Sequence, residues 1–106
     1  ERKRQAKVRA AGLVSAFDAA MKEAVAAYKA KEAEKAESRF FDAQRLAEKL
    51  RQTDEEAFNE GGWDPRLVEA QFGRVAVALM KKDGQAARSL LETAKRNARW
   101  STPLSF

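Results

Sequence analysis

The sequence predicts an all-α protein, either an antiparallel helical hairpin or a bundle of three to four helices. First, the helix-forming residues Ala, Glu, Lys, Leu and Arg make up 62 of the 106 residues. Second, only nine residues are Val or Thr and none is Ile, which argues against a sheet of several strands. Third, the apolar residues recur at helical spacing. The length of the chain fits a single domain over residues 1–106.

Residues 10–59 have helical periodicity without proline, and Gly12 is the only glycine among them. One apolar stripe occupies the first part, and a second stripe, displaced by roughly 80° around the helix, occupies the rest. The first stripe consists of Leu13, Phe17, Met21, Ala24 and Tyr28, with Val14 and Val25 at its edge. The second stripe consists of Ala36, Phe40, Ala43, Leu46, Ala47, Leu50 and Phe58. Residues 29–38 lack a large apolar side chain but have high helix propensity. The segment is therefore one long helix or a helical hairpin. The displacement favours a break within 29–38, with Ser38 as a candidate N-cap.

Residues 65–100 have the pattern of an antiparallel αα-hairpin. Asp64 and Pro65 predict the start of its first helix, with a carboxylate as N-cap and proline at the first helical position. Asp83 and Gly84 predict the turn, and residues 101–106 form a tail. Residues 75–80 are apolar on all sides, so we expect other helices to surround this part of the hairpin.

Residues 1–9 contain five basic side chains, Arg2, Lys3, Arg4, Lys7 and Arg9. If a helix continued through them, several would fall on the arc that Leu13 and Phe17 use for packing. Charged side chains are rarely buried without a partner. We therefore expect the packed part to begin near residue 10, with residues 1–9 as a basic overhang. The overhang either contacts phosphates or another acidic surface, or is a solvated linker.

The net charge of +5 is unevenly distributed along the chain. Residues 1–31 and residues 65–106 each carry +5, whereas residues 32–64 carry −5. One interpretation is complementarity within the fold, in which an acidic helix packs between basic ones. The other interpretation is that the basic ends face an anionic partner such as nucleic acid.

The composition argues against an enzyme. The chain has no histidine and no cysteine, so it lacks the usual general base at neutral pH, the commonest metal ligand and any thiolate nucleophile. No phosphate-binding sequence follows Gly61 and Gly62. The longest uncharged stretch, residues 10–17, is too short to span a bilayer. We therefore expect no catalytic residue, no cofactor, no metal, no small-molecule substrate and no membrane span.

The aromatic residues indicate candidate surfaces for a protein partner. Phe41 falls outside the packing stripe, and an apolar ring on a polar face is typical of association. Trp63 in a glycine turn and Trp100 at a helix end are further candidates, although Trp63 could instead close the end of the bundle. The sequence thus predicts a non-enzymatic interaction or assembly module that binds a protein partner or forms a homo-oligomer. The alternative, a basic helical DNA- or RNA-binding domain, depends on charge alone.

Overall fold

The structure, a computed structural model, describes residues 2–98. Helices make up 88% of this part of the chain and it contains no strand, which confirms the predicted all-α class. Six helices follow one another along it, and the molecule measures 48 × 26 × 23 Å. They are α1 (Arg2–Ala11), α2 (Val14–Lys29), α3 (Ala33–Thr53), α4 (Glu55–Glu60), α5 (Asp64–Met80) and α6 (Gly84–Ala98).

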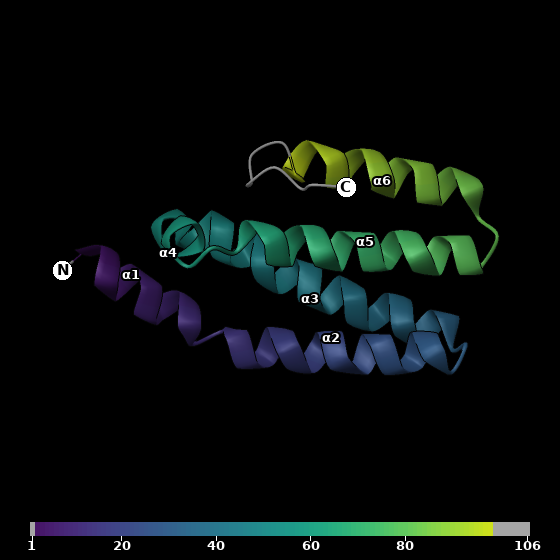
Figure 1. The fold of residues 1–106 in the computed structure, drawn as a ribbon, viewed down its shortest axis with the longest axis horizontal. Coiled ribbons are helices and arrows are strands. Elements are labelled where there is room, and N and C mark those ends of the chain that lie inside the picture. The colour runs from purple at the N-terminus through teal and green to yellow at the C-terminus, as the bar shows by residue number, and fades with distance from the viewer. Residues whose placement is uncertain (1, 99–106) are drawn as a thin grey trace.

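The helices form two antiparallel pairs that are stacked side by side (Figure 1). The first pair is α2 with α3, and the second pair is α5 with α6. Because α3 packs against both α2 and α5, it joins the two pairs, and α6 packs on the far side of α5. The short helix α4 connects the pairs, and α1 lies against it at the left-hand end of Figure 1. The fold is thus a layered series of helices rather than a closed bundle.

The main core lies among α1 to α5 and depends on a few large side chains. Phe17, Phe58, Trp63 and Leu67 are each at most 2% exposed. The rings of Phe17 and Trp63 meet edge to face, with their centroids 5.4 Å apart. Buried alanines fill most of the remaining positions, which lets the helices approach closely. A smaller cluster centred on Val75, Ala78 and Ala87 joins α5 to α6.

The chain turns back on itself at residues 30–32, within the segment 29–38, so α2 and α3 form a hairpin rather than one long helix. Lys31 takes a left-handed conformation with φ of 62°. Its N–H donates to the carbonyl of Tyr28, and the N–H of Glu32 donates to that of Ala27, as in a Schellman motif. Ser38 lies inside α3, so the expectation that it caps this helix is wrong.

Two breaks that periodicity did not predict divide the first half of the chain further. One separates α1 from α2 at residues 12–13, and the other separates α3 from α4 at Asp54. Asp54 has an extended backbone, with φ of −151°, and its side chain accepts a hydrogen bond of 3.2 Å from the N–H of Ala57. It is therefore the N-cap of α4.

The second helical pair differs from the sequence prediction at both ends of α5. Asp64 is the first residue of α5 instead of its cap, because Trp63 occupies the N-cap position without a side-chain hydrogen bond. The turn between α5 and α6 spans residues 81–83. Its left-handed residue is Lys82, with φ of 59°, and Gly84, which was predicted as part of the turn, is the first residue of α6. The side chain of Asp83 accepts a hydrogen bond of 3.0 Å from the N–H of Ala86 and so caps α6.

Candidate functional site

Phe41 lies on the outer surface of α3 with 39% of its area exposed. The guanidinium groups of Arg74 and Arg45 lie 4.8 Å and 5.8 Å from the centre of its ring. Arg74 is itself held in place, because its Nε donates to Glu37 at 2.8 Å and its Nη1 donates to Gln44 at 3.0 Å. The ring is thus outside the core, as the sequence predicted, and a fixed arginine supports it.

This arrangement has the chemistry of a contact surface. Aromatic and arginine side chains are enriched at the centres of protein interfaces. A cation over an aromatic face contributes roughly 0.5–1 kcal/mol at an exposed site, and more when a partner removes the surrounding water. The side chain of Arg74 is only 20% exposed and bonded to α3, so it can stay beneath a partner that covers Phe41.

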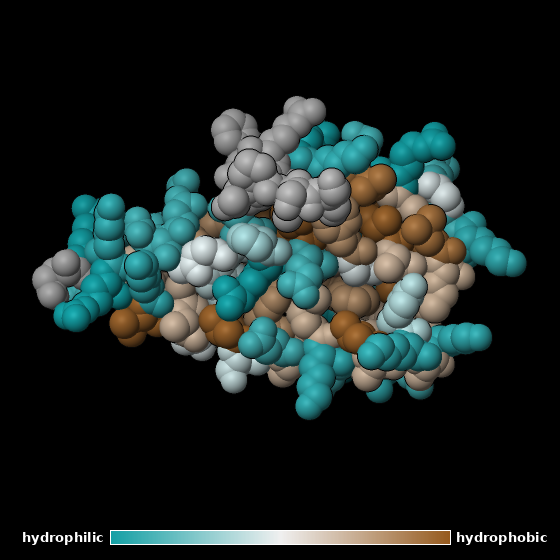
Figure 2. Space-filling model, in the orientation of Figure 1, coloured by the Kyte–Doolittle hydropathy of each residue, from teal (hydrophilic) through white to brown (hydrophobic). Residues whose placement is uncertain are grey.

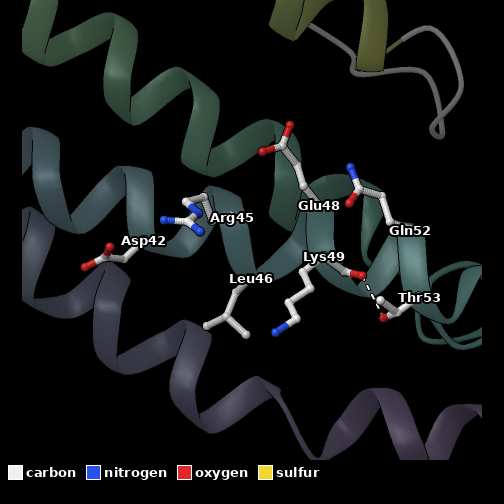
Figure 3. Close-up of a pocket in the computed structure, with 7 residues that line it drawn as sticks. All are labelled: Asp42, Arg45, Leu46, Glu48, Lys49, Gln52 and Thr53. Atoms are coloured by element: carbon white, nitrogen blue, oxygen red, sulfur yellow. Dashed lines mark hydrogen bonds between the residues drawn. The ribbon is translucent and has the colours of Figure 1, made fainter.

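A shallow groove runs along the outer face of α3 (Figure 3), and Arg45, whose guanidinium lies over the Phe41 ring, is one of its lining residues. Its walls come from this one helix, and Leu46 is its only large apolar side chain. The charged ends of Arg45, Glu48 and Lys49 point in different directions rather than toward one spot. Such a surface fits an extended polar contact better than a small ligand. The lining residues are Asp42, Arg45, Leu46, Glu48, Lys49, Gln52 and Thr53.

The structure removes Trp63 from the candidate contact residues. Its side chain is 0% exposed and packs against Phe17, with the Arg66 guanidinium 5.3 Å from its ring centre. The turn at Gly61 and Gly62 folds the indole into the core, so the interpretation of Trp63 as a partner contact is wrong. Trp100, the third candidate, lies outside the described residues.

The basic residues at the start of the chain form helix α1, which is docked on α4 instead of overhanging. Arg9 bonds both carboxylate oxygens of Asp54, at 2.6 Å and 3.1 Å, and Arg2 pairs with Glu56 at 2.8 Å. The hydrogen bonds from Arg9 lower the pKa of Asp54 below its ordinary value, and that from the Ala57 N–H adds to the effect. The predicted overhang is therefore wrong, because the acidic start of α4 pairs with two of its bases.

The remaining bases of this group stay at the surface of α1. Ala6 and Ala10, 0% and 1% exposed, form the side that packs in the core. Lys3 and Lys7 are exposed and make no ion pair with a described residue, and Arg4 is exposed as well. The proposed anionic contact thus has fewer available bases than the sequence suggested.

A second groove, which the apolar pattern of the sequence does not predict, lies between α2 and α5. Val25 and Tyr28 on α2 are 39% and 38% exposed, although both belong to or adjoin the first apolar stripe. The place of Val25 at the edge of that stripe is the sequence signal that could have indicated this groove. The lining residues are Met21, Lys22, Val25, Ala26 and Lys29 of α2 and Glu69 of α5.

The far end of α5 is also less enclosed than predicted. Residues 75–80 were expected to be surrounded, but α5 packs mainly between α3 and α6, and Leu79 is 61% exposed. Apolar side chains gather over α5 and α6 on the face shown in Figure 2. This end of the stack therefore presents apolar surface to solvent.

The described residues hold no group of three or more acidic side chains placed to bind a metal ion. None of the helices α1 to α6 has the length and hydropathy required to cross a bilayer. Comparison with protein-family models, with curated proteins and with solved structures finds no match to this chain. The surfaces described above are therefore the basis for a functional proposal.

Proposed function

We propose that this chain is a non-enzymatic helical module that binds a protein partner, or a second copy of itself, through the outer face of α3. The observation that supports the proposal is the exposed ring of Phe41 between Arg45 and Arg74, beside a long open groove. A central aromatic ring with a charged rim has the anatomy of a protein interface.

The size of this face suits a protein segment better than a small molecule. α3 has 21 residues and is therefore about 32 Å long. A standard interface buries about 800 Å² on each partner, which the outer side of a helix of this length can supply together with its neighbours. The charges on the face are of both signs, with Asp42 and Glu48 beside Arg45 and Lys49. This balance favours a partner of mixed charge over a polyanion.

Nucleic-acid binding remains the alternative function, but the fold gives it less support than the sequence did. The pairing of Arg2 and Arg9 with Glu56 and Asp54 uses two of the five bases in residues 1–9 within the molecule. Charge complementarity between segments therefore accounts for part of the uneven charge distribution.

The experiment compares Phe41→Glu with Val8→Glu. Val8 is a matched control, because it is an exposed apolar residue on α1, 67% exposed and remote from α3 in sequence. Light scattering at protein concentrations up to about 1 mM detects self-association with a free energy of about −4 kcal/mol or better. Affinity capture from the source cells with wild-type and variant baits detects a different partner.

We expect Phe41→Glu to lower the oligomeric mass or to abolish capture of a partner, while the helical circular dichroism is unchanged. Val8→Glu should leave mass and capture as they are in the wild type. The proposal is wrong if Phe41→Glu and Val8→Glu behave alike in both assays. It is also wrong if Phe41→Glu unfolds the chain, because Phe41 would then be a core residue.

A further inference from the structure

The groove between α2 and α5 combines apolar side chains with two lysines that form no ion pair within the described part of the chain. Met21, Val25 and Ala26 supply its apolar lining, and Lys22 and Lys29 line it from the same helix, α2. Neither lysine makes an ion pair with any residue between 2 and 98. Val25 is more than a third exposed, as is Tyr28, its neighbour one turn along the same helix.

The spacing of these residues gives the groove a definite pattern. Lys22 and Lys29 are seven residues apart, which places them on the same side of α2 with their backbones about 10.5 Å apart along its axis. Val25 follows Lys22 by three residues and precedes Lys29 by four, so it lies between them on the helix surface. The groove therefore presents a cation, an apolar side chain and a second cation in a row.

The wall on the side of α5 has the opposite charge. It contributes Glu69, so the cations stand along one edge of the groove and a single carboxylate stands along the other. A duplex of nucleic acid or an anionic membrane presents one sign of charge over its whole surface and would be repelled by Glu69. An amphipathic helix can instead present acidic side chains at one edge, an apolar side chain in the middle and a neutral or basic side chain at the other edge.

We infer that this groove is the docking site for an acidic amphipathic helix of a partner protein. The partner helix carries two carboxylates seven residues apart with a large apolar side chain between them. Docking a helix into this groove buries Val25, and the aliphatic stems of the two lysines add to the covered surface. This site shares no residue with the groove along α3 and does not include Phe41, so it gives the module a second contact surface independent of the first.

The test uses a synthetic alanine-rich helical peptide with Glu at positions i and i+7 and Leu at position i+3. Fluorescence anisotropy of the labelled peptide measures its Kd for the folded protein. The groove variant is Lys22→Glu with Lys29→Glu. The matched control is Arg88→Glu with Lys95→Glu, because these two bases are also exposed, also seven residues apart and lie on α6.

We expect the groove variant to bind the peptide about tenfold more weakly or worse, since two attractive pairs become repulsive. The control variant has the same net charge as the groove variant. It should bind the peptide within about twofold of wild type, because its two substituted residues lie on α6 and do not line the groove. A peptide with Lys in place of both Glu residues should prefer the groove variant over wild type. Val25→Ser should also weaken binding of the Glu peptide.

If circular dichroism shows that the charge reversal disturbs the fold, the same binding measurement is made with the milder double variant Lys22→Gln with Lys29→Gln. Equal weakening by the groove and control variants would overturn the inference, because it would reflect net charge alone. Absence of peptide binding at millimolar concentration would overturn it as well. So would binding of duplex DNA or anionic lipid vesicles that requires Lys22 and Lys29 while peptide binding does not.

Discussion

Gly73 of α5 lies directly against the ring of Phe40 of α3, so that a methyl group on Gly73 would overlap the ring atoms Cδ1 and Cε1. Phe40 is 4% exposed and belongs to the main core, which leaves its ring little room to move. Glycine inside a helix costs about 1 kcal/mol relative to alanine. Its presence in the middle of α5 is explained by the close approach of the two helices that join the stacked pairs.

We therefore expect Gly73→Ala to lower the free energy of unfolding by about 1–3 kcal/mol, because overlap in a packed core outweighs the gain in helix propensity. Gly84→Ala is the control, since nothing lies within 4 Å of a methyl group there. That variant should be neutral or slightly stabilising. Urea denaturation of both variants, with the slope m unchanged, measures the difference. If Gly73→Ala stabilises the protein as Gly84→Ala does, the packing argument is wrong.

Lys82 is held in a conformation that glycine adopts at lower cost. The N–H of Lys82 donates to the Leu79 carbonyl and that of Asp83 donates to the Ala78 carbonyl, which closes the end of α5 with φ of 59° at Lys82. A non-glycine residue in the left-handed backbone region destabilises the folded state by about 1–2 kcal/mol. Glycine avoids this cost, but its greater backbone freedom in the unfolded chain costs about 0.5–1 kcal/mol of stability.

Lys82→Gly should accordingly raise the free energy of unfolding by about 0.5–1 kcal/mol, measured by urea denaturation. The converse variant is Gly62→Ala, because Gly62 has φ of 66° at the equivalent point of the turn before α5. It should destabilise by about 1 kcal/mol although its added methyl group meets no atom within 4 Å. Changes of opposite sign in the free energy of unfolding for Lys82→Gly and Gly62→Ala support this explanation, and changes of the same sign contradict it.

These turns also explain which parts of the fold the sequence could predict. The all-α class and the helical pattern of the second half follow from composition and periodicity. The reversal after α2 was expected only somewhere within residues 29–38, because its left-handed residue is Lys31 rather than glycine. Asp54 carried a recognisable signal, an acidic N-cap followed by Glu55 and Glu56, but the continuous apolar pattern around it concealed the break.

The surfaces were less predictable, because they depend on contacts between distant residues. Arg9 and Asp54 are 45 residues apart, and no local pattern shows that one would neutralise the other. Trp63 follows two glycines, which is typical of a surface turn, yet tertiary packing on Phe17 buries it. Phe41 was correctly placed outside the core because its position on the helix is a local property. The groove between α2 and α5 required the fold.

The pairing of Asp54 with Arg9 makes the docking of α1 sensitive to acid. The hydrogen bonds from Arg9 hold the pKa of Asp54 below its ordinary value. The ion pair therefore stabilises the docked position of α1 at neutral pH, and this stabilisation is lost as the pH falls through the lowered pKa. Amide resonances of Ala6 and Ala10, followed by NMR below pH about 4, should report the release of α1.

Asp54→Asn should weaken the docking already at neutral pH and remove this acid transition. Asparagine is as good an N-cap as aspartate, so α4 should keep its start. Asp42→Asn is the control, because Asp42 pairs with Arg39 on α3 and not with α1. An acid transition of the Ala6 and Ala10 resonances that survives in Asp54→Asn would show that another group controls the docking.

The last prediction separates the two candidate functions through the bases of α1. Contacts between bases and phosphates release counterions, so the logarithm of affinity for duplex DNA falls with the logarithm of salt concentration by about 0.9 per phosphate neutralised. Lys3→Gln with Lys7→Gln removes two exposed bases that make no ion pair with a described residue, so it should flatten this slope by up to about two units. The docking of α1, reported by the resonances of Ala6 and Ala10, should not change.

Arg2→Gln with Arg9→Gln removes the same number of charges but also the ion pairs to Glu56 and Asp54, so it should loosen α1. We expect the wild-type protein to bind duplex DNA weakly and to lose that binding near 0.15 M salt, because exposed pairs are largely screened there. Such weak, salt-sensitive binding is compatible with a protein-interaction module, which does not need to bind nucleic acid. Tight binding that persists at about 0.15 M salt and depends on Lys3 and Lys7 would instead favour the DNA- or RNA-binding function. Loss of binding only in the arginine variant would show that the docked position of α1, rather than its free lysines, creates the anionic contact.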